Sequence, residues 1–231
     1  MAINVETLKT RSLTAVVFVA VMLAGLLWNQ WSFIVLFTIV HFGCWYEFVK
    51  LMKKIYSDRY LKYCLLGLIY ITMPLCMLID LRLENIVYKG NFVFADFGYI
   101  LPCTIIFSIW INDTMAYIVG SLIGKTPFSK ISPKKTWEGT GGGAILCVTV
   151  IGLLAYFIPV AKQIAIQHWV AIAATCAIFG TVGDLLESKI KRMANVKDSG
   201  YIMPGHGGFL DRFDSLLVAV PFVWLYVKLF I

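Results

Sequence analysis

Residues 12–28 read SLTAVVFVAVMLAGLLW, a run of seventeen residues without a charge. An apolar helix of roughly 20 residues spans the hydrocarbon core of a bilayer, which is about 30 Å thick. A secretory signal peptide has a similar apolar run, but no small-x-small cleavage site follows residue 28. The chain instead continues through Asn29 and Gln30 into another apolar segment. We therefore interpret residues 12–28 as a retained first membrane span.

Six further apolar segments follow the first one. None shows the alternation of a barrel strand, so only helices can satisfy the backbone of these segments in lipid. The 231 residues are 60% hydrophobic and 14% charged, with a mean hydropathy of +0.81, whereas a soluble domain needs more polar surface. We predict an all-α, polytopic transmembrane bundle of about seven or eight helices. The six segments are residues 31–49, 63–79, 92–124, 140–159, 165–183 and 216–231.

The topology depends on the segment 92–124, which is too long for one straight span and carries Asn112 and Asp113 in its middle. It is either one tilted helix or two helices broken at this pair. Basic residues accumulate in cytoplasmic loops. If the segment crosses once and the N-terminus is cytoplasmic, nearly all lysines and arginines fall on the cytoplasmic side. We therefore favour this arrangement, with an odd number of crossings. It leaves only Arg82, Lys89, Lys162 and Lys228 on the other side.

The polar segment 184–215 repeats one pattern at its two ends. Residues 184–188 (DLLES) and 211–215 (DRFDS) each carry acids at positions i and i+3 and a serine at i+4, on one helical face. Both patterns border an apolar segment, so we expect them near the membrane surface on adjoining helices. Their carboxylate and hydroxyl oxygens suit Mg²⁺, which usually keeps waters and shares a substrate phosphate.

Basic residues and glycines lie between these two patterns. Lys189, Lys191 and Arg192 alternate with the acids, as expected if the acids hold a cation and the bases hold the phosphate oxygens of a polyphosphate. Residues 204–208 (PGHGG) cannot form a helix, and their glycines allow the backbone to approach a ligand. We expect His206 to orient a ligand by hydrogen bonding rather than to act as a general base.

Two polar segments upstream complete the candidate site. In residues 132–139 (SPKKTWEG), Lys134 and Lys135 could hold phosphates, and the glycines at 139–143 permit close approach of a helix or a substrate. Asp113 lies inside a predicted span, where an ionisable group is costly and functional by default. A simpler interpretation is that Asp113 only pairs with a lysine.

Taken together, these segments resemble the signature of the phosphatidate cytidylyltransferases (CDP-diacylglycerol synthases). The resemblance is dense over residues 112–215, whereas the first hundred residues resemble the family only as apolar spans. We therefore divide the chain into N-terminal transmembrane helices (1–111) and a catalytic transmembrane region (112–231). The motifs that carry the resemblance are Asp113-Thr-x-Ala-Tyr117, Ser132-Pro-Lys134-Lys135-Thr136-Trp137-Glu138-Gly139, Ser188-x-x-Lys191-Arg192, Lys197-Asp198 and Pro204-Gly205-His206-Gly207-Gly208-x-x-Asp211-Arg212-x-Asp214.

The resemblance implies transfer of a cytidylyl group from CTP to phosphatidic acid, which gives CDP-diacylglycerol and pyrophosphate. It implies Mg²⁺ bound by Asp184 and Asp211, and leaves open whether a monovalent cation joins it. The catalytic residues that it implies are Asp184, Ser188, Lys197, Asp198, His206, Asp211, Arg212 and Asp214. The substrate-binding residues that it implies are Asp113, Tyr117, Ser132, Lys134, Lys135, Thr136, Glu138, Lys191, Arg192, Gly205, Gly207 and Gly208.

Two other functions stay open at this point. A CTP-dependent lipid-alcohol kinase or a related lipid cytidylyltransferase would share the metal and nucleotide features but use another acceptor. A transporter would also carry acids and broken helices within its spans, although here the polar groups form one patch. The net charge of +7 fits a basic cytoplasmic face, and we expect no nucleic-acid partner. The short loops favour a bacterial inner membrane with the site facing the cytoplasm, and the sequence leaves open whether the chain forms a homodimer.

Overall fold

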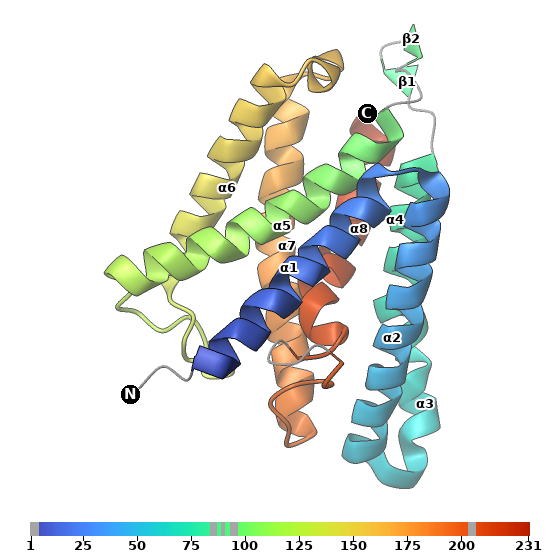
Figure 1. The fold of residues 1–231 in the computed structure, drawn as a ribbon, viewed down its shortest axis with the longest axis vertical. Coiled ribbons are helices and arrows are strands. Elements are labelled where there is room, and N and C mark those ends of the chain that lie inside the picture. The colour runs from blue at the N-terminus through green and yellow to red at the C-terminus, as the bar shows by residue number, and fades with distance from the viewer. Residues whose placement is uncertain (1–4, 84–86, 89–90, 93–96, 203–206) are drawn as a thin grey trace.

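The computed structural model describes residues 5–83, 87–88, 91–92, 97–202 and 207–231, and within these the side chains of 12–83, 98–202 and 207–231. Most of the described chain is helical (Figure 1), which confirms the predicted all-α bundle and its helix count. The α-helices are α1 (Val5–Leu27), α2 (Gln30–Tyr56), α3 (Tyr60–Cys64), α4 (Met73–Leu83), α5 (Phe97–Ile123), α6 (Trp137–Phe157), α7 (Ile166–Met193) and α8 (Leu210–Phe230). Shorter elements are the 3₁₀ turns Ser57–Arg59 and Val160–Gln163, the π-helical turn Leu68–Thr72, and the strands β1 (Val87–Tyr88) and β2 (Asn91–Phe92).

Five helices are long and apolar enough to cross a membrane. They cover residues 30–64, 98–123, 137–157, 166–193 and 210–230, and a shorter apolar helix covers Ser12–Leu27. Large apolar side chains such as Leu13, Phe42 and Leu122 are more than 60% exposed on the helix surfaces, as lipid-facing side chains are. The protein is therefore a multi-pass membrane protein.

The long fourth segment is a single helix. α5 runs without a break through Asn112 and Asp113, and Figure 1 shows it strongly tilted across α7. The predicted start at residue 92 was wrong, because Asn91 and Phe92 form β2, which pairs antiparallel with β1 (Val87↔Phe92). Single crossing of this segment, which the charge pattern favoured, agrees with the structure.

The basic segments gather at one end of the bundle. In Figure 1 the connections α2–α3, α5–α6 and α7–α8 lie at the lower end, together with the start of α1. The connections α1–α2 and α6–α7 lie at the upper end, together with the C-terminus. The lower end therefore carries the lysines and arginines of residues 50–62, 125–135 and 189–212. That this end faces the cytoplasm stays a prediction.

The two acidic patterns extend the ends of adjoining helices, as predicted. α7 continues beyond its apolar part to Met193, and α8 begins at Leu210, so Asp184 and Asp211 both lie on helices. The helices approach closely here: a Cβ added to Gly183 of α7 would lie 2.5 Å from the backbone oxygen of Asp214 on α8. Glycine at this position therefore brings the two acidic ends together.

Glycines also bring α6 against α5 beside Asp113. A Cβ on Gly139 would lie 2.7 Å from the backbone oxygen of Ala116, and one on Gly143 would lie 2.8 Å from the backbone nitrogen of the same residue. The pair Gly139 and Gly143 forms the small-xxx-small pattern typical of tightly packed membrane helices. The glycine run at 139–143 thus allows close approach of a helix, one of its two predicted roles.

Exchange of one glycine of this run should therefore be costly and exchange of another should not. Gly143→Ala places a methyl group against the backbone of α5, and we expect it to lower the free energy of unfolding by about 1–3 kcal/mol. A Cβ at Gly141 meets nothing within 4 Å, so Gly141→Ala should be neutral or slightly stabilising, since alanine favours helix. Thermal unfolding of both purified variants in one detergent measures the difference. Equal stability of the two variants would contradict this packing.

A charged cavity between α5, α6 and α7

The loop that connects α5 to α6 is held in a defined shape. The backbone of Phe128 donates to the oxygen of Lys135 (2.8 Å), and that of Trp137 donates to the oxygen of Thr126 (3.0 Å). The Thr136 hydroxyl accepts a bond from the backbone nitrogen of Gly139 (3.1 Å) and caps the start of α6. A serine or threonine at this position satisfies backbone donors that the first turn leaves unpaired. The loop therefore presents Lys134 and Lys135 from a fixed backbone.

Glu138 is part of this loop structure. Its carboxylate accepts bonds from the backbone nitrogens of Lys125 (3.2 Å) and Thr126 (3.1 Å) and from the Thr126 hydroxyl (2.8 Å). These bonds join the first turn of α6 to the residues that follow α5. Although the sequence resemblance implied substrate binding by Glu138, the contacts that the structure describes for it lie within the loop.

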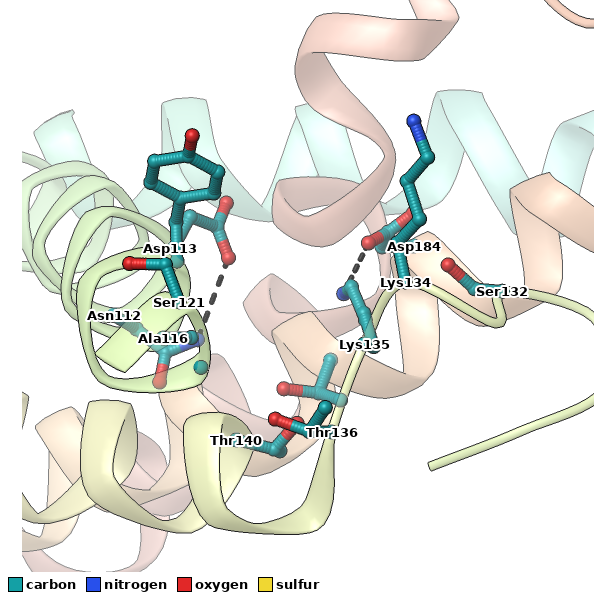
Figure 2. Close-up of a pocket in the computed structure, with 13 residues that line it drawn as sticks. Asn112, Asp113, Ala116, Ser121, Ser132, Lys134, Lys135, Thr136, Thr140 and Asp184 are labelled. Atoms are coloured by element: carbon teal, nitrogen blue, oxygen red, sulfur yellow. Dashed lines mark hydrogen bonds and ion pairs between the residues drawn. The ribbon is translucent and has the colours of Figure 1, made fainter. Parts of the chain in front are cut away.

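The loop, α5 and α7 enclose a cavity of about 540 Å³. Figure 2 shows Asp113 of α5 and Asp184 of α7 on opposite sides of it, with Lys135 of the loop beside Asp184. The Lys134 side chain extends away from this pair. Seven predicted site residues line the cavity: Asp113, Tyr117, Ser132, Lys134, Lys135, Thr136 and Asp184. Other lining groups are Asn112, Ala116, Gly120, Ser121, Thr140 and Thr181.

Opposite charges meet in this cavity. Lys135 Nζ forms an ion pair with Asp184 Oδ2, and both side chains are more than a quarter exposed. The Ser188 hydroxyl, one turn further along α7, lies 3.3 Å from Asp184 Oδ1. Asp113 accepts a long bond from the Asn112 amide (3.4 Å). The charges of Lys135 and Arg212 both act on Asp113, so the acids of the cavity have basic neighbours.

Asp211 takes part in a second cluster at the start of α8. Its Oδ1 accepts a charged bond from Lys191 Nζ (2.6 Å). Its Oδ2 accepts bonds from the Ser199 backbone nitrogen, the Ser199 hydroxyl and the Gly208 backbone nitrogen, each at 2.8 Å. Lys191 also pairs with the buried Glu187. Both oxygens of Asp211 are therefore occupied by donors of the protein itself.

Glu47 of α2 belongs to the same cluster, and the sequence analysis missed it. It is 3% exposed and accepts bonds from the backbone nitrogens of Phe209 (3.0 Å) and Leu210 (2.9 Å). Its Oε2 also lies 2.7 Å from the Ser199 hydroxyl, whose one proton it shares with Asp211. The first N–H groups of a helix have no partner within it and favour a negative charge. Glu47 supplies that charge from a distant part of the chain. An acid inside an apolar segment was the available signal.

The glycines of this region surround the two carboxylates. A Cβ on Gly208 would lie 2.1 Å from Glu47 Oε1, and one on Gly200 would lie 2.2 Å from the same atom. Gly207 has a φ of +83°, and its Cβ would lie 2.5 Å from Asp211 Oδ2. From the sequence, Gly207 and Gly208 were expected to accommodate a ligand. In the structure, the groups that they accommodate are internal carboxylates.

The other predicted residues lie around these two clusters. Asp214 is 8% exposed and accepts a bond from the Ser215 backbone nitrogen (2.6 Å). The charges of Asp184 and Asp113 act on it. Arg192 donates to the Val196 oxygen (3.1 Å) at the end of α7. Lys197 is exposed, and Asp198 lines a different cavity. Predicted residues Gly205 and His206 lie outside the described residues.

Of the two predicted metal-binding acids, Asp184 is better placed than Asp211 to bind Mg²⁺. Asp184 lines an accessible cavity opposite Asp113, and hydroxyl groups lie nearby. One or two carboxylates with waters and substrate phosphates are the usual Mg²⁺ ligands. Asp211 could bind the ion only after losing one of the hydrogen bonds that it accepts within the protein. Among the residues that the structure describes, no three His, Cys, Asp or Glu side chains are placed to bind one metal ion.

The fold and this site define a helical membrane protein with a charged cavity of about 540 Å³ at one end of its bundle. A sequence model of the cytidylyltransferase family matches residues 64–230. The chain belongs to this family, in agreement with the resemblance that the sequence indicated.

The chain is similar to several bacterial proteins named phosphatidate cytidylyltransferase. The phosphatidate cytidylyltransferase of Bacillus subtilis (strain 168) is 36% identical over 186 residues, which are 79% of this chain and 64% of the relative. Those of Staphylococcus saprophyticus and Staphylococcus aureus (strain COL) are 36% and 34% identical over 76% of this chain and 62% of their own length. The chain thus covers less than two thirds of the length of these relatives.

The role of Glu47 can be tested by removing its charge. Glu47→Gln keeps the shape but turns an amide N–H₂ toward backbone donors, so we expect a loss of about 2 kcal/mol or more in the free energy of unfolding. The control is Asp58→Asn, an exposed acid at the same end of the bundle, which should change it by less than about 0.5 kcal/mol. Thermal unfolding in detergent measures both. A stable Glu47→Gln variant would show that α8 does not depend on this carboxylate.

Proposed function

We propose that this protein is a phosphatidate cytidylyltransferase, which transfers CMP from CTP to phosphatidic acid and releases pyrophosphate. The single observation that carries the proposal is the Lys135–Asp184 ion pair in a cavity that Asp113 also lines. Acids and bases interleaved in this way suit a polyphosphate that binds with a cation. Membership of the cytidylyltransferase family and the names of the relatives support the same reaction.

The lining residues divide into two groups by charge. Lys134 and Lys135 would bind the phosphates of CTP, and the hydroxyls of Ser132 and Thr140 would add neutral hydrogen bonds. Asp184 and Asp113 would hold Mg²⁺. Bound there, the ion would supply positive charge to the phosphate oxygens of CTP. Lys135 now provides the positive charge that Asp184 faces, so cation binding at Asp184 would free Lys135 for a phosphate oxygen.

The chemistry demands little proton transfer from the protein. The phosphate monoester of phosphatidic acid is already anionic near neutral pH and attacks the α-phosphorus of CTP without a strong general base. The main barrier is bringing anions together and stabilising the charge that develops, which fixed cations accomplish. A cavity with two lysines and without a described histidine in its lining fits this requirement. An alcohol acceptor would need a base to take its proton.

The position of the cavity suits a lipid and a soluble nucleotide at once. Residues of the α5–α6 connection line it, and this connection lies at the end of the bundle that carries the basic segments (Figure 1). There, acyl chains can stay in the bilayer while CTP arrives from water. We assign this end to the cytoplasm because basic connections are retained there. The bacterial relatives support an inner membrane as the location.

The reaction can be tested with purified protein, labelled CTP and phosphatidic acid in detergent, with and without Mg²⁺. We expect a CDP-lipid that requires both phosphatidic acid and the metal. Phosphorylation of an added polyprenol, without any CDP-lipid, would replace the proposal by a lipid-alcohol kinase. No CTP consumption with any acceptor would reject the enzyme and revive the transporter.

The two predicted metal-binding acids should respond differently to substitution. Asp184→Asn removes a charge that faces an accessible cavity, so we expect at least a 100-fold loss of turnover with little change in thermal unfolding. Asp211→Asn removes the charge that pairs with Lys191 and replaces one of two accepting oxygens by an N–H₂ donor, so we expect lost activity together with a loss of roughly 2 kcal/mol or more in stability. Turnover assays and unfolding of the same preparations separate the cases. An active Asp184→Asn variant would contradict the assignment of the cavity.

A further inference from the structure

One face of α5 forms an open side of the charged cavity. Asp113, Tyr117 and Ser121 follow one another at intervals of four residues and therefore lie on the same side of the helix. All three line the cavity, and all three are exposed; Tyr117 is 78% exposed. A side chain that lines a cavity and is also exposed lies at its rim. The cavity therefore opens along this face of α5.

The surface of α5 next to this opening is apolar. Ile118 and Leu122, each one position beyond a rim residue, are 41% and 76% exposed. Residues 98–123 are long and apolar enough to cross a membrane, so the last turns of α5 lie at the end of a span, beside the basic α5–α6 connection. A lipid that packs against Ile118 and Leu122 in the bilayer therefore brings its headgroup to the opening.

The two lysines of the cavity lie opposite this face. Figure 2 shows Asp113 and Ser121 on one side and Lys134 and Lys135 on the other. Lys135 pairs with Asp184, whereas none of the ion pairs within the described part of the chain involves Lys134, which is exposed. The positive charges that suit the phosphates of a nucleotide are thus concentrated on the side away from α5.

This arrangement sets the direction of attack in the proposed reaction. An oxygen of the acceptor phosphate forms a bond to the α-phosphorus of CTP, the bond from that phosphorus to the bridging oxygen breaks, and pyrophosphate leaves with the electron pair. The attacking and leaving oxygens lie roughly in line, on opposite sides of the phosphorus. With the pyrophosphate part of CTP on Lys134 and Lys135, the acceptor oxygen has to approach from α5.

We propose that phosphatidic acid binds at the outer face of α5, with its phosphate at Tyr117 and its acyl chains against Ile118 and Leu122. The Tyr117 hydroxyl is the donor available to the phosphate, because the Ser121 hydroxyl already donates to the Ile118 oxygen (2.8 Å). This inference rests on the proposed function and deepens it: lipid and nucleotide share one cavity, and the lipid lies opposite the leaving pyrophosphate.

An anionic headgroup can approach the acid on this side because other charges compensate it. The positive charges of Lys135 and Arg212 both act on Asp113. The proposed function also assigns Asp113 to Mg²⁺, whose charge would further favour a phosphate. Binding of the lipid is therefore to be measured with Mg²⁺ present.

Two substitutions on opposite sides of the cavity should affect different substrates. Tyr117→Phe should raise the dissociation constant of short-chain phosphatidic acid about tenfold, the effect of one hydrogen bond to a charged group. It should leave the affinity for a CTP analogue with a methylene group between the α- and β-phosphorus unchanged. Lys134→Gln should do the reverse. Calorimetric titration of the protein in detergent with Mg²⁺ measures both ligands.

The matched control is Tyr46→Phe, at a 65% exposed tyrosine of α2 that does not line the cavity. It should keep both dissociation constants within about twofold of the parent, as most surface substitutions do. If Tyr117→Phe binds phosphatidic acid as tightly as this control, the headgroup site is overturned. Weaker binding of the lipid in Lys134→Gln, with the analogue unaffected, would overturn the assignment of the two sides.

The route of the lipid has its own matched pair. Ser121→Trp places a large ring across the opening and should raise the KM for phosphatidic acid at least about fivefold, since overfilling a limited space is costly. The KM for CTP should not change. Ile145→Trp adds the same ring to α6, where Ile145 is 69% exposed and outside the cavity lining, and should alter neither value. Equal KM values for phosphatidic acid in the two variants would overturn this route.

These results can be distinguished from failure of the proposed reaction. If the parent protein binds phosphatidic acid in a Tyr117-dependent way but makes no CDP-lipid, the proposed reaction is wrong and the lipid site stands. If it makes CDP-lipid with a KM for phosphatidic acid that neither Tyr117→Phe nor Ser121→Trp changes, the reaction stands and the lipid site is overturned.

Discussion

The start of α8 depends on two buried carboxylates that accept its first backbone N–H groups. Glu47 binds the nitrogens of Phe209 and Leu210, and Asp211 binds that of Gly208. In a membrane protein such donors have little access to water, and each buried donor without a partner costs free energy. Because Glu47 lies on α2 and Asp211 on α8, the same bonds join the two halves of the chain. Glycine at 200, 207 and 208 leaves the space that these carboxylates occupy.

This cluster is connected to the charged cavity through α7. Lys191 pairs with Asp211 and with Glu187, which lies one helical turn before it. Asp184 lies three residues before Glu187 on the same helix and lines the charged cavity. One helix therefore uses its last turns to stabilise the bundle and the preceding turn to line the cavity.

Much of this arrangement could be predicted from the sequence, for identifiable reasons. Apolar segments of bilayer length and the distribution of lysines predicted the helices and the single crossing of α5. Acids at i and i+3 predicted polar faces on α7 and α8, because helix periodicity is local. The partners of these acids could not be predicted, since they are set by packing between distant segments. Glu47 is separated from Leu210 by 163 positions, and only its presence in an apolar segment marked it. The signature alone also could not show that Gly207 and Gly208 surround protein carboxylates.

The charged side chains differ in whether their partners lie within the protein or whether they face an open cavity. Lys191 pairs with both Asp211 and Glu187, and Glu138 binds its own loop. Charges that are satisfied in this way stabilise the fold and have little capacity left for a ligand. Asp113 and the Lys135–Asp184 pair line an open cavity instead. Acids and bases that meet in accessible volume suit a polyphosphate that binds with a cation. The cavity between α5, α6 and α7 is therefore the part of the bundle that fits the proposed nucleotide.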